Sequence, residues 1–292
     1  MAQTVLVVGS LHHDIMIEAD HLPRPDETAV GRHWLPKFGG KGGNQAVAAA
    51  RAGAPTRMCG AVGQDGFGAF LTAGLDAAGV DRRFVATLPG IGTGISVAVV
   101  VPGGDYAATI VSGANLAIDA AVLDETALWQ GVGLLILQNE VAPALNLAAA
   151  RAARARDIRV VLNAAPARDM APALAALVDI LVVNAVEAEM MGTAPVTDLA
   201  SAALAAGALA LHCANVIVTA GGAGLALCAP GLSVMIAAQR VAVVSSHGAG
   251  DCFVGTLGAA LADGADLATA CDAASRAAAR HVATPAPPDP GL

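Results

Sequence analysis

The sequence contains few charged and few aromatic residues. Charged residues make up 14% and aromatic residues 3% of the 292 residues, whereas hydrophobic residues make up 55%. Such a composition argues against an intrinsically disordered chain and favours a protein with a well-buried sheet. The net charge is −8 and the sequence shows no basic face, so we predict that the protein does not bind nucleic acid.

Paired cysteines and long apolar runs are also missing. The five cysteines are scattered without a C-x-x-C pair, so the sequence indicates neither a zinc site nor a disulfide framework. The apolar run Val5–Val8 near the N-terminus is too short for a signal peptide or a membrane span. We therefore expect a cytoplasmic protein with reduced thiols and no membrane partner.

Two widespread nucleotide-binding motifs are absent as well. The chain has no G-x-x-x-x-G-K-[ST] run, which argues against a P-loop NTPase. Its first apolar run is followed by Ser10-Leu11-His12, where a Rossmann dinucleotide enzyme would carry a glycine-rich turn. An oxidoreductase on such a core is therefore disfavoured.

Short β-branched runs, by contrast, recur along the chain and alternate with Ala/Leu-rich stretches long enough for helices. The alternation predicts an α/β fold with a doubly wound, mostly parallel sheet flanked by helices. The expected strands are Thr4–Gly9, Leu134–Gln138, Val160–Asn163, Ile180–Asn184 and Val216–Thr219. Ligands of such sheets bind at the carboxyl ends of the strands, so the polar residues there are expected to line one crevice. These residues are Gln138, Asn139, Glu140, Asn163, Asn184 and Thr219.

Two segments break this alternation because they contain paired strand patterns without a helix between them. Asp14–Ile17 pairs with Ala29–Trp34, and Gly94–Val101 pairs with Tyr106–Val111 across the turn Pro102–Asp105. We expect a single domain over residues 1–292, with a small β-sheet lid formed by about residues 11–37 and 93–112. The proline-rich tail Thr284–Leu292 is expected to end the fold as an extended segment.

Two glycine-rich turns precede predicted helices. In the first, Gly248-Ala249-Gly250-Asp251 leads into the helical pattern Cys252–Ala262. Exposed backbone N–H groups at a helix N-terminus bind anions, and Asp251 there is either an ordinary first-turn residue or a general base. In the second, the run Gly39–Asn44 leads into the helical pattern Gln45–Arg51 and is either a tight turn or a binding site.

Together these turns resemble the two signatures of the ribokinase-like (PfkB) family of carbohydrate kinases, and the resemblance is greatest to its ribokinase members. Most of the chain follows the family's pattern in order. The matching segments are Val8–Ser10 with Asp14, Gly39–Asn44, Val62–Gly68, Thr93-Gly94, Gly113–Asn115, Asn163–Ala167, Asn184–Glu189, Thr219–Gly222 and Gly248–Asp251.

The resemblance implies ATP-dependent phosphorylation of a sugar hydroxyl, with ribose or a related small sugar as substrate. It assigns Asp251 as the base, with Gly248, Ala249 and Gly250 stabilising the transferred phosphoryl group. The implied sugar-binding residues are Asp14, His12, Gly40, Lys41, Asn44, Glu140 and Asp251. The implied nucleotide-binding residues are Asn184, Thr219, Gly221, Gly222, Gly224 and Gly250.

The resemblance further implies a magnesium ion and a homodimer formed through the lid. Asn184 and Glu187 match the motif by which the family positions Mg²⁺, usually through water, and the two residues share one helical face. The same pair also fits a helix N-cap followed by its N3 glutamate, so both interpretations stay open.

The chain departs from the family pattern at two places. Ser245-Ser246 replaces the usual Asp-Thr in a loop that helps to bind an activating monovalent cation, so this cation is doubtful here. His12 replaces an asparagine of ribokinases, which puts the identity of the sugar in doubt. Adjacent strand residues point to opposite faces, so a metal site at His12-His13-Asp14 is disfavoured.

These departures leave several functions open. Within the family, a nucleoside, a ketohexose or a keto-deoxy acid would be alternative substrates, although the scarcity of aromatic residues favours a sugar over a nucleoside. An inactive sugar-binding regulator is the alternative from another class, and the presence of Asp251, Asn184 and Glu187 argues against it.

Overall fold

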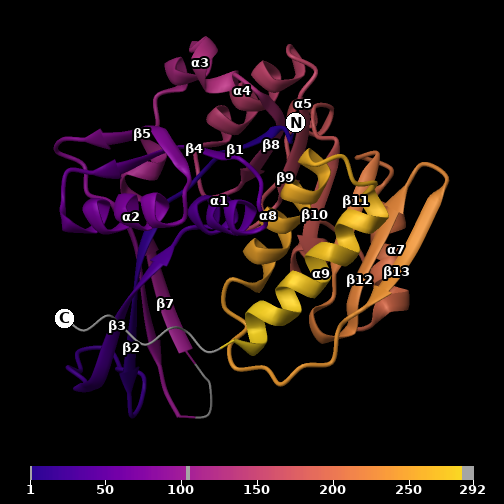
Figure 1. The fold of residues 1–292 in the computed structure, drawn as a ribbon. Coiled ribbons are helices and arrows are strands. Elements are labelled where there is room, and N and C mark those ends of the chain that lie inside the picture. The colour runs from indigo at the N-terminus through magenta and orange to yellow at the C-terminus, as the bar shows by residue number, and fades with distance from the viewer. Residues whose placement is uncertain (1, 103–105, 285–292) are drawn as a thin grey trace.

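A nine-stranded sheet forms the centre of the molecule (Figure 1). The structure is a computed structural model and describes residues 2–102 and 106–284. The strand order is β13-β12-β11-β10-β9-β8-β1-β4-β5, and all neighbours are parallel except β11 with β12 and β12 with β13. The strands are β1 (Thr4–Val8), β4 (Thr56–Gly63), β5 (Asp81–Leu88), β8 (Val132–Gln138), β9 (Arg159–Asn163), β10 (Ile180–Asn184), β11 (Asn215–Thr219), β12 (Gly224–Ala229) and β13 (Leu232–Ala237).

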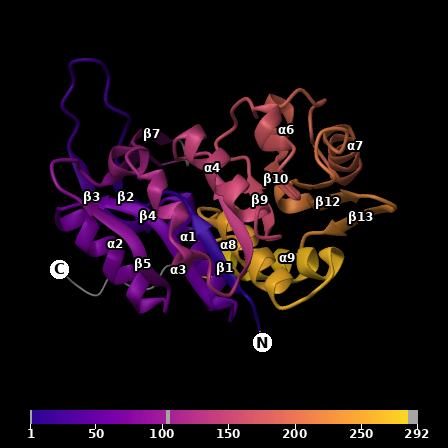
Figure 2. The ribbon, with the colours of Figure 1, turned by 90° about the horizontal axis from the view of Figure 1, so that it is seen from above.

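Helices cover both faces of this sheet (Figure 2). One face carries α1 (Lys41–Arg51), α2 (Gly66–Ala77), α8 (Ala249–Ala262) and α9 (Leu267–Ala283). The other carries α4 (Pro143–Arg154), α6 (Ala185–Met190) and α7 (Leu199–Leu209). Shorter helical turns are α3 (Thr126–Trp129), α5 (Pro172–Ala175), η1 (Gly113–Leu116), η2 (Ala120–Asp124) and η3 (Gly221–Ala223). In the part of the chain that the structure describes, no helix has the length and hydropathy needed to cross a bilayer.

Strand β1 shows why the sheet needs two helical layers. Side chains of a strand alternate between its two faces, and every residue from Val5 to Val8 is buried. Val5 and Val7 pack into the core beneath α1 and α8, whereas Leu6 and Val8 pack into the core beneath α4. A continuous apolar run is therefore the pattern of a strand covered on both sides, as the sequence predicted.

The fold class expected from the sequence is confirmed. Each of the five predicted strands is present, and each differs by at most two residues from its predicted bounds. The sequence analysis did not anticipate β4, β5, β12 or β13, and of these β12 and β13 form the antiparallel edge of the sheet.

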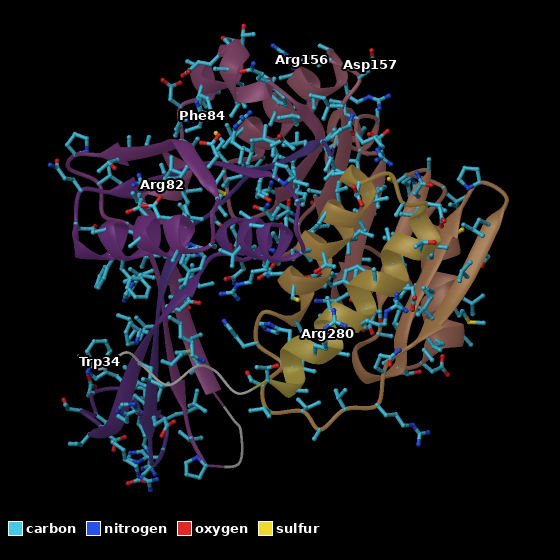
Figure 3. All side chains as sticks on the ribbon, viewed as in Figure 1. Trp34, Arg82, Phe84, Arg156, Asp157 and Arg280 are labelled. Carbon is cyan, nitrogen blue, oxygen red and sulfur yellow. The ribbon has the colours of Figure 1, made fainter. Side chains whose placement is uncertain are left out.

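A second sheet of four strands, in the order β3-β2-β6-β7, projects away from the large one (Figure 1). Its strands are β2 (His12–Ala19), β3 (Gly31–Gly39), β6 (Gly94–Val100) and β7 (Tyr106–Val111), and β2 and β6 join the two predicted antiparallel pairs in parallel. The predicted turn Pro102–Asp105 and the predicted tail Thr284–Leu292 lie outside the described residues except for Pro102 and Thr284. Trp34 is half exposed on this sheet (Figure 3), where the expected homodimer contact stays a prediction.

Helices α1 and α8 approach each other closely at Gly255. A Cβ atom at this position would lie 2.4 Å from the backbone oxygen of Gln45 and 2.6 Å from the Cβ of Ala48. Only glycine allows this distance between the helices, because the obstacle includes backbone atoms that cannot rotate away.

We expect Gly255→Ala to lower the free energy of unfolding by roughly 1–3 kcal/mol, because the added methyl group overpacks the contact. Gly207→Ala in α7 is the matched control, since a Cβ atom at Gly207 would have no neighbouring atom within 4 Å. That variant should gain about 0.5–1 kcal/mol from the higher helix propensity of alanine. Urea unfolding of both variants measures the difference, and a stabilised Gly255→Ala would refute the packing constraint.

Candidate active site

The turn before α8 exposes backbone N–H groups at the N-terminus of that helix. Gly248 is the N-cap of α8 and has φ of 75°, a left-handed conformation that favours glycine. The helix begins at Ala249, so Asp251 lies in its first turn and no side chain caps the N-terminus. The free N–H groups and the positive end of the helix dipole therefore make this turn suitable for a phosphate.

The carboxylate of Asp251 is buried and receives two hydrogen bonds from α1. Asn44 Nδ2 donates to Oδ2 at 3.2 Å, and Gln45 Nε2 donates to Oδ1 at 2.9 Å. Burial raises the pKa of Asp251 to about 6, although the Lys41 charge and the two amide donors oppose this rise. A carboxyl group with this pKa is ionised at neutral pH and can still accept a proton.

The glycine run places these amides by bringing α1 against the start of β2. Gly40 has φ of 83°, and a Cβ atom there would lie 2.6 Å from the backbone nitrogen of His12. Helix α1 begins directly after it at Lys41, four residues earlier than the predicted helical pattern. Asn44 and Gln45 consequently lie on its first turns and reach Asp251 on α8.

A cavity of about 190 Å³ lies in front of this carboxylate. Its walls come from the carboxyl ends of β9, β10 and β11, from the turn before α8, and from Lys41. Nine residues predicted for the site or the crevice line it together: Lys41, Asn163, Asn184, Glu187, Thr219, Gly248, Ala249, Gly250 and Asp251. The Lys41 charge opposes the rise that burial causes in the pKa of both Asp251 and Glu187, and all three residues line the cavity.

Asn184 and Glu187 form a complete capping box at the start of α6. Asn184 Oδ1 accepts a hydrogen bond from the Glu187 backbone at 2.8 Å, and Glu187 Oε2 accepts one from the Asn184 backbone at 2.9 Å. Burial raises the pKa of Glu187. The cap occupies only Oε2, so Oε1 is available for a cation that keeps most of its waters, as Mg²⁺ does. The described residues contain no cluster of three or more His, Cys, Asp or Glu side chains that would bind a metal directly.

Glu140 lies behind the glycine run, just after β8. Its Oε2 atom accepts hydrogen bonds from the Ser10 hydroxyl and, at 2.8 Å, from the Lys41 backbone. The Nδ1 atom of buried His12 lies 3.6 Å from the same oxygen. The carboxylate of Asp14 lies 3.7 Å from His247 Nε2, so β2 meets the loop before α8. His13 points away from this group and stacks on Phe67 at 4.3 Å, as the alternation along a strand predicts.

Five of the expected residues lie neither at the cavity nor in the group around Glu140 and the glycine run. Gly221, Gly222 and Gly224 do not line the cavity, and a Cβ atom at Gly224 would lie 2.1 Å from the Ile236 oxygen, so sheet packing explains that glycine. The Gln138 side chain packs against Gly9, and Asn139 donates to the Pro166 oxygen at 3.0 Å. The side chains of these two residues therefore contact neighbouring loops and do not line the crevice.

The structure adds three residues that the sequence analysis did not assign. Gln45 donates to Asp251, Ser10 donates to Glu140, and His247 faces Asp14. The position of Gln45 directly beside Asn44 was the available signal, because two amides in one helical turn can serve one carboxylate.

Known proteins are similar to this chain over most of its length. A ribokinase of Bacillus subtilis (strain 168) is 32% identical over 281 residues, which cover 96% of this chain and 93% of that protein. A ribokinase of Mus musculus is 34% identical over 261 residues, which cover 88% of this chain and 81% of that protein. The structure of Arabidopsis thaliana ribokinase complexed with ribose and ATP superposes with a TM-score of 0.89 at 28% identity, covering 97% of this chain and 93% of that chain.

The family model described as pfkB family carbohydrate kinase matches residues 2–287. The chain therefore belongs to the pfkB family of carbohydrate kinases.

Proposed function

We propose that the protein transfers the γ-phosphoryl group of ATP to the primary hydroxyl of ribose or a closely related small sugar. The observation that carries the proposal is the buried Asp251 carboxylate in the first turn of α8, beside free N–H groups and at the wall of a cavity. The cavity offers an anion site and a base within one turn of helix, and in-line phosphoryl transfer requires both.

The sugar lies, in this proposal, between the glycine run and the start of β2. Asp14 and Glu140 supply carboxylate oxygens that accept from sugar hydroxyls, and Asn44 supplies an amide. Gly40 brings the backbone close to the sugar. His12 stands next to Glu140 and limits the space for the ring, so it contributes to the choice of sugar.

The phosphate chain of ATP lies, in this proposal, along the cavity towards β10 and β11. The N–H groups of Gly250 and Asp251 and the ammonium group of Lys41 stabilise charge on the transferred phosphoryl group. Thr219 would contact the nucleotide within the cavity, and the turn Gly221–Gly224 would contact the part that extends beyond it. Glu187 and Asn184 would hold Mg²⁺ through water, and this ion supplies positive charge that neutralises the phosphate oxygens.

Asp251 takes the proton from the sugar hydroxyl as the new oxygen–phosphorus bond forms and the bond from the γ-phosphorus to the bridging oxygen breaks, which releases ADP. Asn44 and Gln45 orient its carboxylate and keep it ionised near neutral pH. The small sheet stands beside the sugar site, and its closure over the cleft would exclude water and suppress ATP hydrolysis.

An assay of ADP release over ribose, 2-deoxyribose, ketohexoses, keto-deoxy acids and nucleosides tests the proposal. We expect the highest kcat/KM with ribose or a related pentose. Asp251→Asn should bind sugar and ATP but lose about 10²–10⁴ in kcat, because the base is removed. A variant that retains more than half of the activity would rule out this role for Asp251, and turnover of nucleosides alone would favour the nucleoside alternative.

The raised pKa of Asp251 sets the acid limb of the pH profile. The base must be ionised, so kcat/KM should be constant above about pH 6 and fall tenfold per pH unit below it. Gln45 stabilises the ionised form, so Gln45→Leu should move the inflection to higher pH. Steady-state rates from pH 4.5 to 8.5 measure both profiles. An inflection that stays in place in Gln45→Leu would contradict the assignment to Asp251.

Replacement of the usual Asp-Thr by Ser245-Ser246 removes a carboxylate from the loop before the turn. We therefore expect potassium to change kcat by less than about twofold relative to tetramethylammonium, since a cation site without carboxylates loses most of its charge attraction. ADP is measured directly by chromatography, so that no coupling enzyme responds to the cation. Severalfold stimulation by potassium would show that uncharged oxygens suffice for the site.

A further inference from the structure

The loop that carries Glu140 is tied to a neighbouring loop by its backbone. It spans residues 139–142 between β8 and α4. The Asn139 backbone N–H donates to the Ala165 oxygen at 2.9 Å, and its side chain donates to the Pro166 oxygen at 3.0 Å. The connection after β9 therefore holds the first residue of the Glu140 loop.

Arg168, from that second loop, reaches both sides of Glu140. Its Nη1 atom donates to the Val141 oxygen at 3.0 Å and to the Asn139 oxygen at 3.4 Å. These are the carbonyl groups of the residues directly before and after Glu140. One guanidinium nitrogen thus holds the peptide group directly before Glu140, between residues 139 and 140, and the carbonyl group of the residue directly after it.

Close packing does not hold this loop on the side of Arg168. A cavity of about 170 Å³ lies there, with Asn139 and Arg168 in its wall together with apolar residues of α4 such as Pro143 and Leu147. Side chains beside an open cavity lack partner atoms on one side, so packing alone restrains them poorly. Val141 of this loop is buried in the core, whereas beside the cavity the loop is restrained by the hydrogen bonds of Arg168.

The guanidinium of Arg168 is poorly compensated. Its Nη2 atom is buried without a hydrogen-bond partner, and no carboxylate of the described residues lies within 4 Å of it. Burial accordingly lowers the pKa of this group. Arg57 shows the contrast, because its buried guanidinium pairs with Asp81 at 2.9 Å and donates to three carbonyl groups. The two hydrogen bonds to carbonyl groups offset the cost of burial only in part, since Nη2 has no partner, so stability alone does not explain the arrangement.

We propose that Arg168 is a positioning residue for sugar binding, which holds the Glu140 carboxylate where it meets the sugar hydroxyls. The inference rests on the proposed role of Glu140 in binding the sugar. It assigns to Arg168 no contact with sugar or ATP. Its effect is therefore expected in the KM for the sugar and not in the KM for ATP.

The test is a mutant cycle of Arg168→Met and Glu140→Gln, measured with the best sugar of the panel above. Glu140→Gln should raise the KM for the sugar roughly tenfold or more, since it weakens a hydrogen bond to a charged group. Arg168→Met should raise it roughly tenfold and leave the KM for ATP within about twofold. In the Glu140→Gln background, Arg168→Met should add less than about twofold, because the residue it positions is already impaired.

Measurements of Tm and two further variants distinguish a positioning role of Arg168 from a general loss of folding stability. The Tm of Arg168→Met should equal or exceed that of the wild type, because the substitution removes an incompletely paired buried charge. Arg168→Lys keeps donors for the two carbonyl groups and should restore part of the sugar affinity. Arg156→Met is the matched control, since Arg156 also donates to a carbonyl group but lies at the end of the molecule opposite to the small sheet (Figure 3). It should leave both KM values unchanged.

The possible results distinguish a failure of the positioning role of Arg168 from a failure of the proposed role of Glu140. If Glu140→Gln raises the KM for the sugar and Arg168→Met does not, the positioning role is wrong and the proposed function stands. If neither variant changes it, the role of Glu140 in the proposed function is wrong, and the inference fails with it. Equal increases of both KM values, or a lowered Tm with an unchanged KM for the sugar, would identify Arg168 as a residue of the fold alone. If Arg168→Met does not fold, an unchanged KM for the sugar in Arg168→Lys overturns the inference.

Discussion

The buried carboxylate of Asp251, held by two amides of α1 at the start of α8, is the interaction on which the site depends. An ionised carboxylate in this position loses its hydration, and the donors Asn44 and Gln45 together with the Lys41 charge offset that cost. All three residues lie on the first turns of α1. The close contact between the two helices at Gly255 therefore serves the active site as well as the core. A larger distance between α1 and α8 would separate Asp251 from its donors Asn44 and Gln45.

Sequence patterns correctly predicted those features of the fold whose physical cause is local. The apolar runs predicted the central strands because burial on both faces demands them, and Gly248 marked a helix start because the backbone there is left-handed. The same reasoning did not predict β12 and β13, which form the antiparallel edge of the sheet. It also left the role of Asp251 open until the family resemblance was considered, because a first-turn aspartate is common and its burial depends on a helix about 200 residues earlier.

The Asn184 and Glu187 pair shows why one pattern can support two interpretations. The capping box is present, yet the same glutamate lines the cavity beside Lys41 and Asp251. The cap uses one oxygen of the Glu187 carboxylate, and the other oxygen can bind a hydrated cation through water. Satisfying the end of α6 thus fixes the direction of a charged group that faces the cavity, so the structural and the functional interpretations are compatible.

Residues that act through the backbone of another loop are the hardest to find in a sequence. Arg168 contacts carbonyl groups 27 and 29 positions earlier in the chain, and carbonyl groups are present at every residue. No residue type at 139 or 141 reveals this contact, because any side chain there would leave the same acceptors. What singles out Arg168 is the imbalance in its surroundings, where a partly buried cation beside a cavity has backbone acceptors but, among the described residues, no carboxylate within 4 Å. In the proposal above, the benefit of this arrangement is the position of Glu140, the residue between the two carbonyl groups that Arg168 contacts.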